Sequence, residues 1–198
     1  MGKLIYLMGK SSSGKDTIFR ELLKVPELKL HKVVLYTTRP IRDNETDGVQ
    51  YHFVDDATFR NFCKENKVIE DRVYHTYHGL WRYFTVDDGS INLEFHNYLI
   101  IGTLESYAKT ADYFGRRNVI PVYIEVDDGI RLQRAINREM CQETPRYEEM
   151  CRRYLADAED FSEEKMKEAG IQKRFNNEYL KECLNNIIEY LFENIADK

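Results

Sequence analysis

The sequence predicts an α/β fold in which a parallel sheet carries helices on both faces. Apolar segments of strand length alternate with segments of helical periodicity over residues 1–37 and 98–198. Strands joined by helices pack in parallel, and their ligands bind beyond the carboxyl ends of the strands. Residues 38–86 interrupt this alternation and are expected to form a small antiparallel insertion, after which residues 87–97 return to the core.

The first strand, expected at residues 4–8, runs into a Gly-rich loop and then a helix. Gly9, Gly14 and Lys15 have the spacing of the phosphate-binding P-loop, G-x-x-x-x-G-K-[ST]. Backbone N–H groups in such a loop, together with the positive end of the following helix, bind phosphate. A merely solvated loop would not need this strand and helix, so we predict a P-loop NTPase-type core. The residues expected to bind ATP here are Gly9, Ser11, Ser12, Ser13, Gly14, Lys15, Asp16 and Thr17.

Asp16 departs from the motif, because it replaces the hydroxyl that would contact Mg²⁺. A carboxylate can ligate Mg²⁺ directly or through water, although it also places negative charge beside a triphosphate. Thr17 follows one residue too late to take the expected position. We therefore expect Mg²⁺ as a cofactor, with Asp16 as the candidate ligand.

A second buried strand is expected at residues 31–37, followed by a loop at residues 38–50 that is rich in turn-forming residues. Arg39 and Arg42 lie at the start of this loop. Two guanidinium groups this close can form a fork on a phosphate, for which arginine is better shaped than lysine.

The rest of the insertion is expected to contain a helix at residues 57–66, a strand at residues 68–74 that includes Glu70, and a hairpin at residues 75–86. Asp55 or Asp56 is a suitable cap for the first helix. A short helix capped by Asp87 or Asp88 is expected within residues 87–97.

Regular alternation then returns, with strands expected at residues 98–102, 119–126 and 172–176. Helices are expected at residues 104–114, 130–139, 146–169 and 178–194. Arg134 and Arg138 share one helical face, and Arg153 lies on the following helix. These arginines are compatible with a solvated charged face or with a helical lid, at about residues 131–153, that closes over phosphates.

The composition limits the function classes. The 198 residues, 42% hydrophobic and 32% charged, suffice for one core with inserted lobes. The net charge of −5 argues against a general nucleic-acid-binding surface. The four scattered cysteines indicate reduced thiols, no apolar run is of membrane-spanning length, and we expect no signal peptide. We expect a cytoplasmic protein that binds small molecules, without a nucleic-acid or membrane partner.

The stretch from Thr37 to Phe53 is the most specific part of the sequence. It resembles the guanylate kinase family pattern T-T-R-x-x-R-x-x-E-x-x-G-x-x-Y-x-F, with Glu45, Gly48 and Tyr51 in place. The resemblance covers nearly the whole chain. It implies a nucleoside monophosphate kinase that transfers a phosphoryl group from ATP to GMP or dGMP with Mg²⁺.

The resemblance also implies residue roles. The acceptor site would comprise Arg39, Arg42, Glu45, Tyr51 and Tyr83 around the phosphate, with Glu70 and Thr85 on the guanine base. The catalytic clamp on the transferred group would comprise Lys15, Arg42, Arg134, Arg138 and Arg153, since phosphoryl transfer needs several fixed cations. Asn176 would lie close to the adenine of ATP.

Several positions depart from the family pattern. Asp16 replaces the P-loop hydroxyl, Leu35 stands where a serine usually helps to bind the base, and Phe84 replaces a glycine. Ile101 and Thr103 stand where the family has an acidic pair. Most of these departures concern the acceptor base.

Two other functions are compatible with the sequence. The first residues, with Gly14-Lys15-Asp16 and Ile101-Gly102-Thr103, are similar to ribose 1,5-bisphosphate phosphokinases, which act on a sugar phosphate. Those enzymes lack the complete arginine loop. The guanylate-kinase-like domains of membrane-associated scaffolds are non-catalytic binding modules, but they have lost the ATP loop that is retained here. A function similar to that of guanylate kinases is therefore the first of the three hypotheses.

Overall fold

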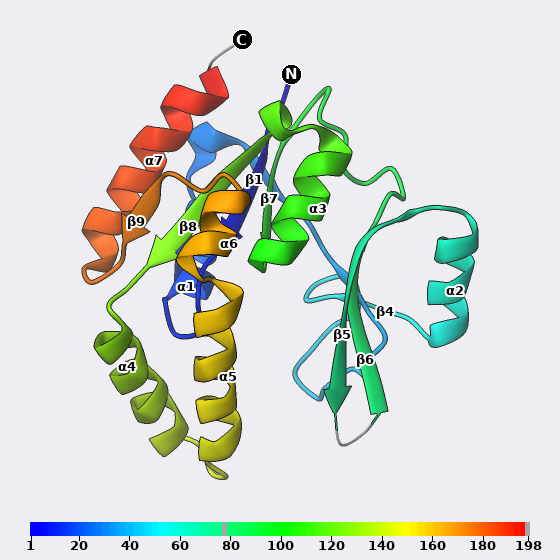
Figure 1. Ribbon diagram of the computed structural model, residues 1–198. Coiled ribbons are helices and arrows are strands. Elements are labelled where there is room, and N and C mark those ends of the chain that lie inside the picture. The colour runs from blue at the N-terminus through cyan, green and yellow to red at the C-terminus, as the bar shows by residue number, and fades with distance from the viewer. Residues whose placement is uncertain (77–78, 197–198) are drawn as a thin grey trace.

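Five parallel strands form the larger sheet of the computed structural model, which describes residues 1–76 and 79–196 (Figure 1). Their order is β2-β7-β1-β8-β9. The strands are Leu30–Lys32 (β2), Asn97–Gly102 (β7), Leu4–Met8 (β1), Val119–Glu125 (β8) and Arg174–Asn176 (β9). The predicted parallel sheet is therefore confirmed.

Helices cover both faces of this sheet because its central strand, β1, is apolar on both sides. Successive side chains of a strand point to opposite faces. Leu4, Tyr6 and Met8 pack with residues of α3 and α6, whereas Ile5 and Leu7 pack with residues of α1 and α7. The helices are Lys15–Leu22 (α1), Asp56–Lys64 (α2), Leu104–Phe114 (α3), Asp128–Met140 (α4), Tyr147–Asp160 (α5), Glu163–Glu168 (α6) and Leu180–Ala196 (α7), with 3₁₀ turns at Pro26–Leu28 and Arg116–Asn118.

The insertion forms a second sheet of four strands in the order β4-β3-β6-β5. These strands are His52–Phe53 (β4), Tyr36–Thr37 (β3), Gly79–Val86 (β6) and Val68–Thr76 (β5). β6 pairs antiparallel with β3 and β5, but β3 and β4 are parallel. The prediction of an antiparallel insertion is therefore wrong for this pair, because the long loop after β3 brings the chain back before β4 begins. The turn of the predicted hairpin, residues 77–78, lies outside the described residues.

The strand predicted at residues 31–37 is divided between the two sheets. Leu30–Lys32 pairs with β7, and Tyr36–Thr37 pairs with β6. Val33 and Leu35 are buried in the core between these segments. The apolar run continues through both segments, so its pattern does not reveal that the chain changes sheets.

The short helix predicted within residues 87–97 is absent from the structure, which has turns there. Asp88 accepts hydrogen bonds from the Ser90 backbone N–H and the Tyr36 hydroxyl, at 2.9 and 2.7 Å. Gly89 follows in the left-handed region at φ 82°. The carboxylate therefore stabilises a turn, which is the common alternative to a helix cap.

The helix predicted at residues 146–169 is also wrong as a single element. Phe161 is buried and interrupts it, and the Ser162 hydroxyl caps α6 by accepting from the Lys165 backbone N–H. The predicted cap of α2 is confirmed, since Asp55 accepts from the Thr58 N–H. Asp127 caps α4 in the same way by accepting from the Gly129 and Ile130 N–H groups.

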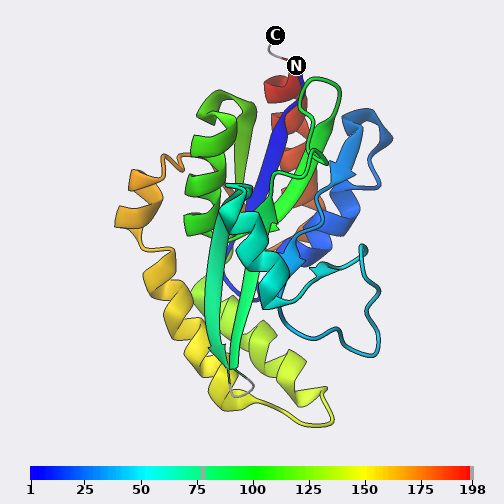
Figure 2. The ribbon, with the colours of Figure 1, turned by 90° about the vertical axis from the view of Figure 1, so that its right-hand side faces the viewer.

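Two hairpins extend from the carboxyl end of the larger sheet. One consists of helices α4 and α5, and the other of strands β5 and β6 (Figure 1). The two hairpins point in the same direction from the sheet in the turned view as well (Figure 2). The P-loop lies at the same end of the sheet, so both hairpins are placed beside it.

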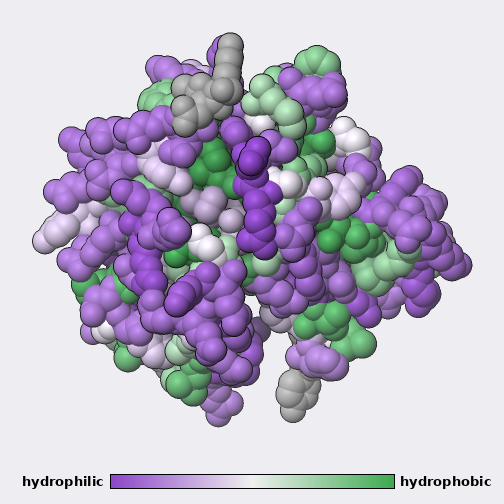
Figure 3. All heavy atoms as spheres, turned by 45° about the horizontal axis from the view of Figure 1, so that its top comes forward, coloured by the Kyte–Doolittle hydropathy of each residue, from purple (hydrophilic) through white to green (hydrophobic). Residues whose placement is uncertain are grey.

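The surface around the N-terminal end of the molecule, which faces the viewer in Figure 3, is mostly hydrophilic. No helix in residues 1–76 and 79–196 is long and apolar enough to cross a membrane.

Candidate active site

The predicted P-loop joins β1 directly to α1, which begins at Lys15. Ser12 and Gly14 both adopt left-handed backbone conformations, at φ 62° and 85°. A Cβ atom on Gly14 would lie 2.4 Å from Asn177 Nδ2, so a larger residue would displace that side chain. The loop therefore requires glycine here for both backbone conformation and close packing.

Asn177 fixes the loop from the other end of the chain. Its Nδ2 donates to the Ser13 carbonyl oxygen at 2.8 Å, and only 3% of the residue is exposed. The predicted Asn176 points elsewhere: it is exposed, and its Oδ1 accepts from the Glu178 N–H at 2.8 Å. No signal in the sequence distinguishes these adjacent asparagines, because the contact joins segments 164 residues apart.

Three cationic side chains predicted for the transfer site converge on the loop. Burial lowers the pKa of Lys15. The charges of four nearby residues also act on this amine: Asp16, Asp157, Arg153 and Arg138. Arg138 Nη1 donates to the Ser12 hydroxyl at 3.3 Å. Positive charge that is gathered around a partly desolvated lysine creates a site for an anion.

Arg134, also predicted for the transfer site, has a different set of contacts. Its Nη2 donates to the backbone carbonyls of Asn177 and Glu178 at 2.9 and 3.3 Å. Arg134 thus attaches α4 to the segment after β9.

Arg131 was not assigned a role from the sequence, yet it is the most buried arginine beside the loop, with 1% of its side chain exposed. It contacts the Ser11 carbonyl oxygen at 2.9 Å, Asp128 at 2.7 Å and Asp157 at 3.4 Å. Asp157 in turn accepts from the Ser11 N–H at 2.7 Å. These contacts attach both α4 and α5 to the P-loop. The arginine spacing could have indicated Arg131, but nothing in the sequence indicates Asp157.

Arg39 lies in the insertion, and most of its guanidinium N–H groups already donate hydrogen bonds to neighbouring residues. Only 4% of the residue is exposed. It forms two hydrogen bonds with Glu45 at 2.6 and 2.5 Å, one with the Tyr83 hydroxyl at 3.1 Å and one with the Pro40 carbonyl oxygen at 2.9 Å. A guanidinium has five N–H donors, so one remains for another acceptor. The hydrogen bonds from Arg39 hold the pKa of Glu45 below its usual range.

Arg42 differs from Arg39 because it is exposed, and its backbone N–H donates to Glu45 at 3.0 Å. Tyr51 packs against Tyr83 with ring centroids 5.4 Å apart. Burial raises the pKa of Tyr51, and among smaller influences Arg39 lowers it and Asp16 raises it. Charged residues of both the arginine loop and the P-loop thus influence the Tyr51 hydroxyl.

Glu70 and Thr85, predicted to bind the acceptor base, are opposite each other on β5 and β6. Both are buried, and the Thr85 hydroxyl donates to Glu70 Oε1 at 2.7 Å. The structure therefore brings the side chains of Glu70 and Thr85 into contact. Arg72, which the sequence analysis did not single out, lies 3.2 Å from Glu70 Oε2 through its Nε.

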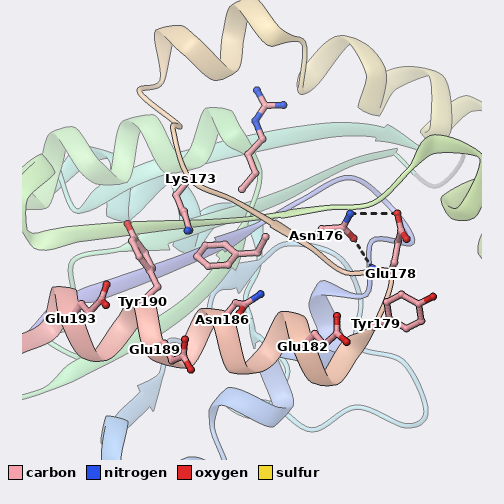
Figure 4. Close-up of a pocket in the computed structure, with 11 residues that line it drawn as sticks. Lys173, Asn176, Glu178, Tyr179, Glu182, Asn186, Glu189, Tyr190 and Glu193 are labelled. Carbon is pink, nitrogen blue, oxygen red and sulfur yellow. Dashed lines mark hydrogen bonds between the residues drawn. The ribbon is translucent and has the colours of Figure 1, made fainter.

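A cavity of about 690 Å³ lies between β9 and α7, and Asn176, Glu178 and Glu182 line part of it (Figure 4). A second, of about 320 Å³, lies at the carboxyl end of β8 and is lined by Lys10, Arg131, Asn176 and Glu178 among others. Asn176 and Glu178 thus belong to both cavities. The second cavity is the one that also includes a P-loop residue, Lys10.

The chain was compared with known proteins. Residues 1–80 match the family model described as guanylate kinase. The guanylate kinase of Zymomonas mobilis is 44% identical over 69 residues, 35% of this chain and 32% of that protein. The guanylate kinase of Thermobifida fusca is 48% identical over 69 residues, 34% of each chain. The matched segments thus span about a third of the length of these relatives.

The fold extends the likeness to the whole chain. The crystal structure of guanylate kinase from Anaplasma phagocytophilum aligns with a TM-score of 0.68 over 100% of this chain and 88% of that chain, at 18% identity. The family model covers less than half of the chain, and the matched residues include the P-loop, Arg39, Arg42 and Glu70. Tyr83, Thr85 and the arginines of α4 and α5 lie beyond it.

Proposed function

We propose that this chain transfers the γ-phosphoryl group of ATP to GMP or dGMP, giving ADP and the nucleoside diphosphate. The observation that carries the proposal is the gathering of positive charge at the P-loop, where Arg138 contacts Ser12 and both Arg138 and Arg153 act on the largely buried Lys15. Phosphoryl transfer depends mainly on positioning and on cations around the transferred group. The relatives named above are guanylate kinases, so neither the sugar-phosphate kinase nor the binding module is favoured.

On the ATP side, N–H groups of the P-loop other than that of Ser11, which donates to Asp157, would hold the phosphates, and Lys15 would contact the transferred group. Arg138, which already contacts Ser12, and Arg153 would neutralise charge that develops during transfer. Arg134 would enter this clamp only by exchanging its carbonyl contacts, and Asn176 would lie near the adenine.

Mg²⁺ fits the same site through Asp16. This exposed carboxylate follows Lys15 at the start of α1 and is a hard oxygen ligand. Mg²⁺ in nucleotide sites is commonly held by one or two carboxylates together with phosphates and water. When bound, the ion would neutralise phosphate charge.

On the acceptor side, Arg42, Tyr51 and Tyr83 would hold the GMP phosphate. Arg39 would add its one remaining N–H donor and, with Glu45, keep the loop in shape. Glu70 would accept from the N–H groups of guanine, with Thr85 as a further base contact.

The same proposal includes the domain division. Residues 1–37 and 98–198 would form the core, with a lid at about residues 131–153, and residues 38–86 would form the acceptor lobe. Closure of the two hairpins would exclude water, which otherwise hydrolyses ATP. The four cysteines are free thiols, compatible with action in the reducing cytoplasm.

The test is to mix the purified protein with ATP and Mg²⁺ and to supply GMP, dGMP, AMP, UMP or ribose 1,5-bisphosphate separately. ADP formation should be fastest with GMP or dGMP. Turnover with the sugar phosphate alone, or with none of the acceptors, would contradict the proposal.

Arg42→Met should weaken acceptor binding without affecting ATP. Loss of one charge-assisted contact to phosphate corresponds to about 1.5–3 kcal/mol, or roughly a tenfold to hundredfold rise in KM for GMP. The KM for ATP should remain within about twofold. Arg60→Met, an exposed arginine on α2, is the matched control. Equal KM values for GMP in the two variants would remove Arg42 from the acceptor site.

A further inference from the structure

Strand β5 carries a largely buried arginine, Arg72, for which the family resemblance implies no role. Residues 70 and 72 share one face of the strand because side chains alternate along it. The Glu70 side chain is 0% exposed and that of Arg72 is 13% exposed. A buried carboxylate and guanidinium therefore lie together in the proposed acceptor pocket.

These two side chains form an ion pair in the proposed pocket. Arg72 Nε lies 3.2 Å from Glu70 Oε2, and within the described part of the chain neither atom has a hydrogen-bond partner. Buried polar atoms are nearly always hydrogen-bonded. A donor and an acceptor that are held side by side by this ion pair alone match a ligand edge that carries an acceptor next to a donor.

The surroundings of Arg72 belong to the acceptor site. Tyr6, Tyr74 and Tyr51 lie within its electrostatic range. Arg72 is opposite Tyr83 on β6, and the Tyr83 ring packs against Tyr51 with centroids 5.4 Å apart. The Arg39 guanidinium lies 5.2 Å from the centroid of the Tyr51 ring, so Arg72 is connected to the proposed phosphate-binding residues through direct contacts.

We propose that Arg72 determines acceptor specificity by donating a hydrogen bond to the 6-carbonyl oxygen of a 6-oxopurine, while Glu70 accepts from N1–H. The inference rests on the proposed transfer to GMP. Adenine presents the opposite pattern, with an amino donor at position 6 and an acceptor at N1. It would leave both Arg72 and Glu70 without complementary partners, which is costly in a buried site.

The residue at position 35 explains why a hydrogen-bond donor from elsewhere in the pocket would be needed. This residue, Leu35, is 7% exposed and packs in the apolar core. It stands where the family resemblance implies a base-binding serine, and its side chain has no hydrogen-bond donor. Arg72 supplies one from a different strand.

The experiment measures kcat/KM for GMP, IMP and AMP in the wild type and in Arg72→Met. IMP has the 6-carbonyl and N1–H of GMP but lacks its 2-amino group. Loss of the Arg72 contact should lower kcat/KM about tenfold to a hundredfold for GMP and IMP alike, with little change for AMP. The GMP/AMP ratio should fall by the same factor.

Arg82→Met is the matched control, because Arg82 on the neighbouring strand pairs with Asp71 at 3.0 Å and its guanidinium lies over Phe59. It should leave the GMP/AMP ratio unchanged. Since Arg72→Met leaves Glu70 charged and unpaired, the double variant Glu70→Gln/Arg72→Met provides a second test without a buried charge. Its GMP/AMP ratio should fall at least tenfold below that of Glu70→Gln alone.

An unchanged GMP/AMP ratio in the Arg72 variants, with a wild type that phosphorylates GMP, would overturn this inference alone. A wild type that neither phosphorylates GMP nor binds it in calorimetry would overturn both the inference and the proposed function.

Discussion

Lys15→Met should lower kcat about a hundredfold to a thousandfold while leaving the fold intact. That range is typical for removing one preorganised group that stabilises transition-state charge. Burial already lowers the pKa of Lys15, so methionine, which has no charge to desolvate, suits the same place. The melting temperature should therefore stay level or rise, in contrast to the activity.

Kinetics and binding together show whether Lys15 acts on the transferred group. The affinity for ATP should fall much less than kcat, because a contact that strengthens only in the transition state affects the rate more than ground-state binding. Lys24→Met, an exposed lysine paired with Glu21 just after α1, is the matched control. A kcat for Lys15→Met within tenfold of the wild type would remove Lys15 from the transfer site.

Local patterns in the sequence were sufficient for the P-loop. A strand, a Gly-rich loop and a helix follow one another without interruption, and Gly9 and Gly14 lie in the same short loop. The contact between Glu70 and Thr85 is likewise local, because both residues belong to one hairpin. These features depend on short stretches of chain whose conformation their own residues largely determine.

The residues that the sequence could not provide depend on distant contacts. Asn177 reaches the P-loop across 164 residues and Asp157 across 146. The division of residues 31–37 between two sheets is of the same kind, since it depends on the different partners β7 and β6. Periodicity reports which positions are apolar, but not which neighbouring element covers them.

Arg131→Met should destabilise the protein by about 3–5 kcal/mol, the typical cost of removing one partner of a buried ion pair. Methionine fills much of the same volume, but Asp157, whose side chain is 15% exposed, would lose its buried cation. For a chain of this size the melting temperature should fall by about 2–4 °C for each kcal/mol. Thermal unfolding followed by circular dichroism measures the shift.

The matched control for Arg131 is Arg152→Met on α5. Arg152 also forms two hydrogen bonds with a carboxylate, Glu149, at 2.7 and 2.8 Å, but its side chain is 62% exposed. Exposed pairs contribute about 0–1 kcal/mol, so this variant should unfold almost as the wild type does. Asp157→Asn should lie between the two, because an amide oxygen can still accept from the Ser11 N–H. Equal melting temperatures for the two arginine variants would mean that water replaces the contacts of Arg131. A large difference would show that the attachment of α4 and α5 to the P-loop contributes to the stability of the whole fold.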